Sequence, residues 1–136
     1  MALVLLDTSV LSLFLPHRSN GPVRALYEPH LLGHTLTLSF QSIAEVWKLP
    51  LRSRWNQKRR DELDTFLRRF IMIPCDYELA RVWARISVEA ERAGRRLEAD
   101  DAWIAATAIH RRLPLFTHDR DLTDLPIRGL TVVSFL

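Results

Sequence analysis

The sequence contains one cysteine, four glycines and no long apolar run, and each scarcity excludes a class of protein. With Cys75 alone, the chain cannot form an internal disulfide or a cysteine-based zinc site. The four glycines are scattered, so no glycine-rich phosphate-binding loop is present. No stretch approaches the roughly eighteen apolar residues of a membrane span, and the first residues lack the basic start of a secretory signal. We therefore expect a cytoplasmic protein that does not associate with a membrane.

The remaining composition is that of an ordinary globular domain. The chain has 136 residues, of which 48% are hydrophobic and 26% are charged. This length suits one domain with a proper core, and we expect a single domain over residues 1–136. The net charge is +3, and 17 of the 19 basic residues are arginine. Arginine pairs well with phosphates and carboxylates, although a GC-rich genome produces the same bias.

Strand-like and helix-like segments alternate along the whole chain, which predicts an α/β fold. The expected strands are Ala2–Leu6, Thr35–Leu38, Ile71–Ile73, Leu113–Phe116 and Leu130–Phe135. Helical spacing is expected over Thr8–Leu15, Val23–Glu28, Asn56–Phe70, from Ser39 until Pro50 breaks the helix, from Asp76 to Gly94, and around Ile104–Ile109. Right-handed crossovers place helices on both faces of a parallel sheet. The prediction is therefore a three-layer α/β/α sandwich with about five mostly parallel strands.

The first strand ends on Asp7, which Thr8 and Ser9 follow directly. Open α/β sheets bind ligands at the carboxyl ends of their strands, so Asp7 is a candidate site residue. Asp and Ser are also common helix caps, and Asp7 taken alone fits that role equally well.

A second predicted strand is also followed by a hydroxyl and an acid, in the segment Thr117, His118 and Asp119. If the two strands are neighbours, Asp7 and Asp119 face each other. Two close carboxylates repel and raise each other's pKa unless a cation lies between them. Mg²⁺ and Mn²⁺ favour carboxylate and water oxygens, so either ion would suit this position.

Two further acidic segments could join this site. Glu45 lies in a segment that is otherwise apolar or small, Ser39-Phe-Gln-Ser-Ile-Ala-Glu-Val-Trp. Asp100 and Asp101 precede the small-residue helix Ala-Trp-Ile-Ala-Ala-Thr-Ala. An acid at a helix N-terminus also favours the helix dipole. Adjacent helical positions point about 100° apart, so we expect only one of the pair to line a site.

Four segments together carry a resemblance to a known family. They are Leu-Leu-Asp-Thr-Ser, Ile-Ala-Glu, Asp-Ala-Trp-Ile-Ala-Ala-Thr-Ala and Leu-Phe-Thr-His-Asp, in this order along nearly the whole chain. The chain resembles PIN domains, and more narrowly the VapC-type ribonuclease toxins of type II toxin–antitoxin pairs.

The resemblance implies a metal-dependent endoribonuclease. Its four acids correspond to Asp7, Glu45, Asp101 and Asp119, which would act in catalysis by binding Mg²⁺ or Mn²⁺. Hydroxyls near the metal would come from Thr8, Ser9 and Thr117. The family also implies an RNA substrate, a small cognate antitoxin and a homodimer.

A basic segment follows Glu45. Residues 48–69 hold eight basic and three acidic residues, with Trp55 among them. We expect RNA contacts from Lys48, Arg52, Arg54 and Trp55, because cations bind phosphates and an aromatic ring stacks on a base. The alternatives are a solvated helix face, or an interface with the antitoxin or a second subunit.

Two other functions remain open. The chain could be a PIN-like RNA-binding or scaffold module without activity, although none of the four acids is missing. It could also be a phospho-accepting α/β domain with Asp7 as the nucleophile. Haloacid-dehalogenase-type enzymes have a second Asp two residues later, whereas Ser9 stands there in this chain.

Overall fold

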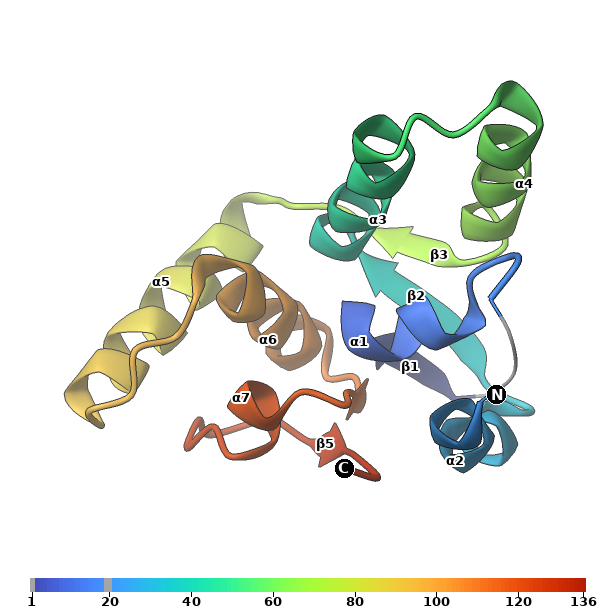
Figure 1. Cartoon of the computed structure of the whole chain (residues 1–136). Helices are drawn as coiled ribbons and strands as arrows, with labels where there is room; N and C mark the ends of the chain where they lie inside the picture. The colour runs from blue at the N-terminus through green and yellow to red at the C-terminus, as the bar shows by residue number, and fades with distance from the viewer. Residues whose placement is uncertain (1, 19–20) are drawn as a thin grey trace.

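The computed structural model describes residues 2–18 and 21–136, and its centre is a sheet of five parallel strands (Figure 1). The strands are β1 (Leu3–Leu6), β2 (Thr35–Ser39), β3 (Ile71–Ile73), β4 (Leu115–Phe116) and β5 (Val132–Val133). Their order across the sheet is β3-β2-β1-β4-β5, so β1 lies in the middle. Because the chain order reverses on either side of β1, ligands are expected at the carboxyl ends of β1 and its neighbours.

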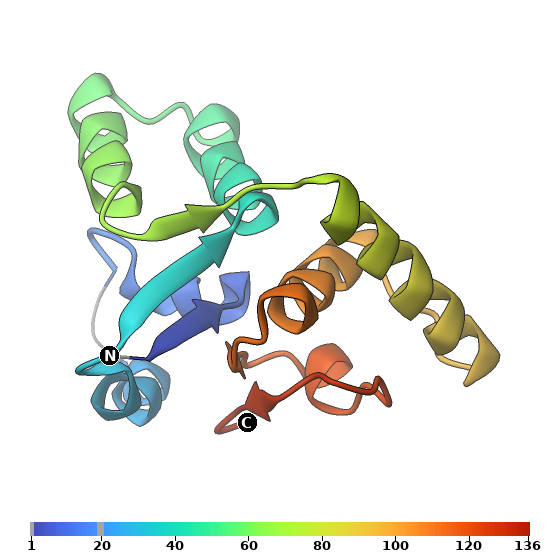
Figure 2. The same cartoon turned by 180° about the vertical axis from the view of Figure 1, so that it is seen from behind.

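Helices connect the strands and cover both faces of the sheet. They are α1 (Thr8–Leu11), the short 3₁₀ helix η1 (Ser12–Phe14), α2 (Pro22–Leu31), α3 (Phe40–Arg52), α4 (Gln57–Leu67), α5 (Tyr77–Arg92), α6 (Ala99–Arg111) and α7 (Arg120–Thr123). Figures 1 and 2 show α3 and α4 on one side of the sheet, and α5 and α6 lying together on the other side.

Side chains of β1 enter two separate hydrophobic cores, because neighbouring strand residues point to opposite faces. Leu5 packs with residues of α5, α6 and α7. Val4 and Leu6 pack with residues of α1, α2, α3 and α4. All three side chains are almost completely buried. The predicted three-layer α/β/α sandwich with a parallel sheet is therefore confirmed.

The prediction that Pro50 breaks its helix is wrong, because α3 continues through it to Arg52. A proline removes one backbone donor and crowds the preceding turn. Here Pro50 lies in the last turn and is buried, so its apolar contacts offset the lost hydrogen bond. The last two strands are also shorter than the predicted Leu113–Phe116 and Leu130–Phe135.

Within the described residues, no helix combines the length and the apolar composition needed to cross a bilayer.

Candidate functional site

The carboxyl ends of β1 and β4 lie side by side, which is the condition under which the sequence brings Asp7 and Asp119 together. Leu6 is paired with Phe116, and the Asp7 backbone N–H donates to the Phe116 carbonyl over 2.9 Å. The next residues of each strand, Asp7 and Thr117, therefore leave the sheet together. This register brings together polar side chains from two segments that are far apart in the chain.

Asp7 is buried, with 3% of its surface exposed, and three donors hold its carboxylate. Oδ2 accepts hydrogen bonds from Ser9 Oγ (2.7 Å) and Thr117 Oγ1 (2.8 Å). Oδ1 accepts from the Thr8 backbone N–H over 2.8 Å, which makes Asp7 the N-cap of α1. Asp7 is thus a helix cap and part of the acidic cluster at once, so the two interpretations of its sequence position do not compete.

Two hydroxyls tie the end of β4 to Asp7. Thr117 Oγ1 also accepts from the Asp119 backbone N–H (3.1 Å), and Ser9 Oγ accepts from the His118 backbone N–H (2.9 Å). The predicted hydroxyls Ser9 and Thr117 therefore lie beside Asp7. The Thr8 hydroxyl lies toward α3 instead: it donates to Ser42 Oγ (2.9 Å), and its hydrogen bond to the Glu45 carboxyl group acts to lower the pKa of Glu45.

Tyr27 of α2 stabilises the segment that follows β4, and the sequence did not indicate this role. Its ring is fully buried, and its hydroxyl contacts the Thr117 carbonyl (3.0 Å), His118 Nδ1 (2.6 Å) and the Phe135 backbone N–H (3.1 Å). A buried tyrosine hydroxyl needs such partners. The contacts fix the backbone of the segment that carries Asp119.

Tyr27→Phe is expected to lower the free energy of unfolding by about 1–3 kcal/mol, because the Phe135 N–H and His118 lose a buried partner. Urea unfolding measures this change. The matched control is Tyr77→Phe, since Tyr77 is 77% exposed and should be replaceable without effect. Equal losses in both variants would show that the Tyr27 hydroxyl does not support the segment.

Further carboxylates lie near Asp7, and we call the whole group the carboxylate cluster. Oxygens of Asp101, Asp119 and Asp121 lie within 4.8 Å of one another. Asp101 comes from the first turn of α6, whereas Asp119 caps α7 and accepts from the Asp121 N–H over 2.9 Å. Asp7 is close enough to Asp119 for the two charges to interact.

The pKa values of three carboxyl groups show how strongly the cluster disfavours negative charge. Burial, followed by repulsion from Asp119, Asp7, Asp121 and Glu45, raises the pKa of Asp101 to about 7. Burial also raises the pKa of Asp7, against the lowering effect of its hydrogen bonds from Ser9, Thr117 and Thr8. The pKa of Glu45 is raised by burial and by the neighbouring Asp100.

The cluster lacks an internal counter-charge. Within residues 2–18 and 21–136, no Lys, Arg or His forms an ion pair with Asp7, Glu45, Asp101 or Asp119. Carboxylates that are desolvated and mutually repelling need a cation from elsewhere to remain ionised. Clustered carboxylate oxygens also have the ligand chemistry that Mg²⁺ and Mn²⁺ prefer, so this donor set fits a divalent ion.

Asp100 and Asp101 have different neighbours. Asp101 lies beside Asp119, whereas the exposed Asp100 lies beside Glu45. Of the two, Asp101 is the one grouped with Asp119, and a contribution from Asp100 stays a prediction to be tested. Asp121 was missed, although an acid two residues after Asp119 was a visible signal.

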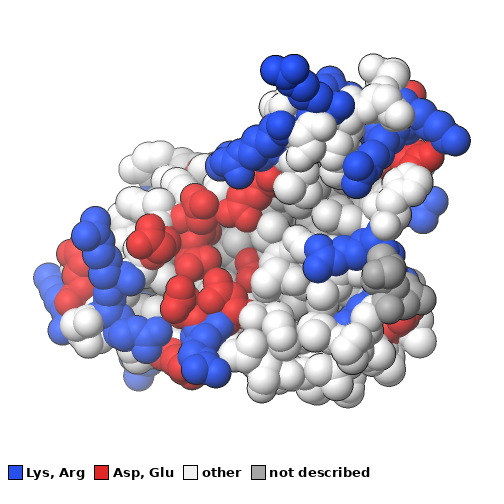
Figure 3. Space-filling view, viewed as in Figure 1, with Lys and Arg blue, Asp and Glu red and all other residues white. Residues whose placement is uncertain are grey.

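The basic segment lies partly beside this cluster. Lys48 and Arg52 are exposed on α3, three and seven residues after Glu45, and these spacings put all three on one helical face. Figure 3 shows acidic side chains gathered in a hollow between α3 and α7, with basic side chains along both borders. Arg54 lies in the turn after α3, and the Arg59 guanidinium covers the Trp55 ring at 3.7 Å from its centroid.

Comparisons with known proteins agree with this architecture. The family model described as PIN domain matches residues 4–127. The chain is 43% identical to Ribonuclease VapC5 of Mycobacterium tuberculosis over 53 residues, which span only 39% of each protein. It is 31% identical to Toxin FitB of Neisseria gonorrhoeae over 124 residues, covering 86% of this chain and 88% of FitB. A chain in the crystal structure of FitAcB from Neisseria gonorrhoeae superposes with a TM-score of 0.73, at 28% identity and 95% coverage of both chains.

The family match spans β1 to the segment after α7 and thus includes every carboxylate of the cluster. The match to FitB covers most of both proteins. The chain therefore belongs to the PIN domain family.

Proposed function

We propose that this protein is a metal-dependent endoribonuclease that hydrolyses RNA phosphodiester bonds and serves as the toxin of a VapBC-type toxin–antitoxin pair. The observation that carries this proposal is the meeting of Asp7, Asp101 and Asp119 at one edge of the sheet, where no basic side chain of the described residues forms an ion pair with them. Membership of the PIN domain family supports it, as do relatives named as a ribonuclease and a toxin.

Asp7, Asp101 and Asp119 are the proposed ligands of Mg²⁺ or Mn²⁺, with Glu45 and Asp121 at the border of the same cluster. When bound, such an ion supplies Lewis-acid stabilisation of phosphate oxygens and lowers the pKa of a water ligand. The donor set suits this role because all the candidate ligands are carboxylates, which are hard oxygen donors.

The hydroxyls of Ser9 and Thr117 orient the carboxylates that are proposed to bind the metal. Ser9 and Thr117 donate to the same oxygen of Asp7, which favours its ionised form and limits its rotation. Thr117 also holds the Asp119 backbone through the Asp119 N–H. Thr117 alone therefore positions both Asp7 and Asp119, which reduces the reorganisation of these residues when substrate binds.

The proposed path of the RNA follows α3 away from the cluster. Lys48 and Arg52 extend from Glu45 on one helical face and would bind successive phosphates, and Arg54 would continue this row. Trp55 is half-buried under Arg59, so a base could stack on this face only after the guanidinium moves.

A cognate antitoxin and a second copy of the chain are the proposed partners. A solved relative from Mycobacterium tuberculosis at 26% identity, with 98% of both chains covered, is described as a member of the VapBC family of toxin–antitoxin systems. An inactive PIN-like module is the second candidate, and the retention of all four predicted acids disfavours it.

Cleavage of purified RNA with and without metal tests the proposal. Cleavage is expected in Mg²⁺ or Mn²⁺, with a loss of at least about a hundredfold in EDTA and recovery when metal is added back. A single 2′-deoxy substitution at the cleaved position should leave cleavage intact, because the attacking nucleophile is water. EDTA-resistant cleavage would exclude the mechanism. A protein that neither cleaves RNA nor binds metal at millimolar concentration would be the inactive module.

A further inference from the structure

A small cavity adjoins the carboxylate cluster. Its volume is about 110 Å³, which is enough for a single phosphate group. Asp101 and Asp121 belong both to the cluster and to the wall of this cavity, whereas neither Asp7 nor Asp119 lines it. The rest of the wall comes from the loop between α5 and α6 and from the segment after α7, with Arg95, Arg96, Leu97, Glu98 and Leu125. We call it the Arg95–Arg96 cavity.

The loop between α5 and α6 holds Arg95 in a defined position. Gly94 follows α5 with a φ of +74°, which glycine adopts readily, and the Arg95 N–H then donates to the Ala90 carbonyl over 2.8 Å. At the far end of the side chain, Nη1 donates to the Asp124 carbonyl over 3.0 Å. Leu97 packs against the hydrophobic core and anchors the loop from within. The half-buried Arg95 guanidinium is therefore oriented before any ligand binds.

Both arginines have hydrogen-bond donors to offer to an anion. Arg96 is exposed, and among the described residues neither Arg95 nor Arg96 forms an ion pair with a carboxylate. A guanidinium group has five N–H donors, so the contact with the Asp124 carbonyl leaves other donors of Arg95 available. Their fork matches the oxygens of a phosphate group, which an ammonium group does not. The cavity thus contains the donors of a phosphate site.

The sign of the charge in the cavity depends on whether a cation occupies the carboxylate cluster. Three carboxylates, from Glu98, Asp101 and Asp121, line the cavity together with the two guanidinium groups. With all five groups ionised the lining is net negative, so the empty site would repel a phosphate. A divalent cation bound in part by Asp101 would reverse this sign. A phosphate is therefore expected to bind here only when the metal is also bound.

We propose that Arg95 and Arg96 bind the RNA phosphate next to the cleaved bond, and that they do so only while the carboxylate cluster holds its metal. This inference rests on the proposed nuclease function. The cleaved phosphate belongs at the cluster itself, and the cavity begins at Asp101, which lines both. Lys48 and Arg52 of α3 are the phosphate ligands proposed for another border, and Figure 3 shows basic side chains along both borders of the acidic hollow. The strand would thus cross the cluster and be held on both sides of the cut.

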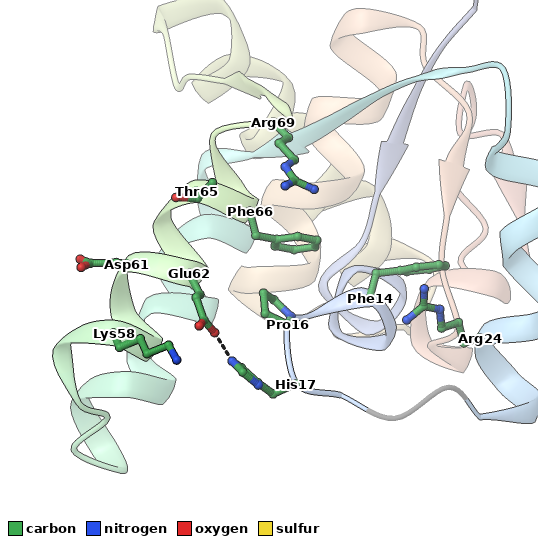
Figure 4. A pocket seen from close by; sticks show the side chains of 10 residues that line it. All are labelled: Phe14, Pro16, His17, Arg24, Lys58, Asp61, Glu62, Thr65, Phe66 and Arg69. Atoms are coloured by element: carbon green, nitrogen blue, oxygen red, sulfur yellow. Dashed lines mark hydrogen bonds and ion pairs between the residues drawn. The ribbon is translucent and has the colours of Figure 1, made fainter.

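A larger cavity, between α4 and the segment that joins η1 to α2, offers no equivalent position (Figure 4). Its volume is about 930 Å³, and Lys58 and Arg69 are among its lining residues. Figure 4 shows the Arg69 guanidinium pointing into it beside Phe66. No member of the carboxylate cluster lines this cavity, so an anion bound there would not require Mg²⁺. Dependence on the metal therefore distinguishes the Arg95–Arg96 cavity from a basic surface elsewhere.

A nucleotide without a phosphodiester bond provides the first test. Uridine 3′,5′-bisphosphate has one phosphate for the metal and another for the arginines, and the proposed reaction cannot cleave it. When it is added in Mg²⁺, two-dimensional NMR of the ¹⁵N-labelled full chain should show shifts of the Arg95 and Arg96 Nε–H signals. In EDTA these signals should stay in place. Equal affinity in EDTA and in Mg²⁺ would overturn the proposal.

Two nearby arginines supply matched variants. Arg96→Gln should lower the affinity for the bisphosphate in Mg²⁺ about tenfold, because a charge-assisted hydrogen bond is lost. Arg92→Gln is the control, since Arg92 is exposed in the last turn of α5 and does not line the cavity. It removes the same charge four residues away, so a general electrostatic effect would appear in both variants. Equal losses in the two would refute a specific phosphate contact.

RNA with one neutral linkage identifies the phosphate that is bound. A methylphosphonate removes the charge of a single linkage, and it is placed on each side of the cleaved bond in turn. At one of the two positions the KM of the unchanged chain should rise about tenfold with kcat unchanged, because this contact does not involve the reacting bond. Arg96→Gln should show no further rise at that position. An unchanged KM at both positions would contradict the assignment.

The phosphate site and the nuclease function fail in different ways. If RNA is cleaved in Mg²⁺ while Arg96→Gln binds the bisphosphate as tightly as the unchanged chain, only the phosphate site is refuted. If the bisphosphate is bound through Arg96 in Mg²⁺ and RNA is never cleaved, the phosphate site stands and the nuclease proposal is refuted.

Discussion

Asp7→Asn is expected to lower the rate of metal-dependent RNA cleavage about a thousandfold, equivalent to about 4 kcal/mol of transition-state stabilisation. Asp7 is buried directly after the central strand β1, and its charge is close to that of Asp119 and Asp101. Asn has the same shape but no negative charge, so the cluster would lose attraction for a divalent ion. Initial rates of cleavage at saturating Mg²⁺ measure the effect.

The fold should survive this substitution. The Asn carbonyl oxygen still accepts from the Thr8 N–H, and the Ser9 and Thr117 hydroxyls can rotate to accept from the amide. The control is Asp124→Asn, because Asp124 is exposed outside the cluster and its replacement should leave cleavage unchanged. Full, EDTA-sensitive activity in a folded Asp7→Asn protein would remove Asp7 from the mechanism.

Asp101→Asn should abolish most activity and, without metal, make the protein more stable. The pKa of Asp101 is about 7 in the folded chain, whereas the ordinary value is 3.8. At pH 8 the folded state therefore contains a carboxylate that its surroundings disfavour. Removing that charge should raise the free energy of unfolding by about 1–3 kcal/mol after allowance for solvent screening. Urea unfolding in EDTA at pH 8 measures the gain.

The gain should depend on pH in a defined direction. A raised carboxyl pKa means that the folded state binds the proton more tightly, so the unchanged chain becomes more stable as pH falls from about 7 toward 4. Its difference from Asp101→Asn should therefore shrink at pH 5. Asp64→Asn is the control, because Asp64 is ion-paired with Arg68 outside the cluster. If Asp101→Asn is the less stable protein at pH 8 without metal, this electrostatic account fails.

Adding Mg²⁺ should reverse the order of stability at pH 8. An ion that binds only the folded state stabilises it in proportion to the logarithm of its concentration over Kd. The unchanged chain keeps the full set of carboxylates and should gain more than Asp101→Asn. The same charges would then destabilise the empty site and stabilise the occupied one.

The sequence predicted the layers of the fold and the place where two strand ends meet. Two apolar runs, one ending on Asp7 and the other on Thr117-His118-Asp119, indicated two parallel strands with polar ends, and the structure shows that these strands are neighbours. The helix expected from Asp76 to Gly94 is α5, and Asp76 caps it, because its side chain accepts from the Leu79 N–H over 2.8 Å. These features depend on local patterns and on chain topology alone.

Other features depend on tertiary contacts that no local pattern reveals. Pro50 remains helical because its burial offsets a lost hydrogen bond, and periodicity carries no information on that balance. Tyr27 supports Thr117 from 90 residues away in the chain. Asp100 of α6 lies beside Glu45 of α3, and this contact follows from how the two helices pack.

The bond between Asp7 and Thr117 joins residues 110 positions apart, and this separation has a consequence for synthesis of the protein. During translation β1 emerges first, but β4 can pair with it only after residues 7–114 have also been synthesised. The acids of the cluster therefore stay apart on every nascent chain. A product truncated before β4 would lack Thr117 and Asp119, and it could not form the proposed site.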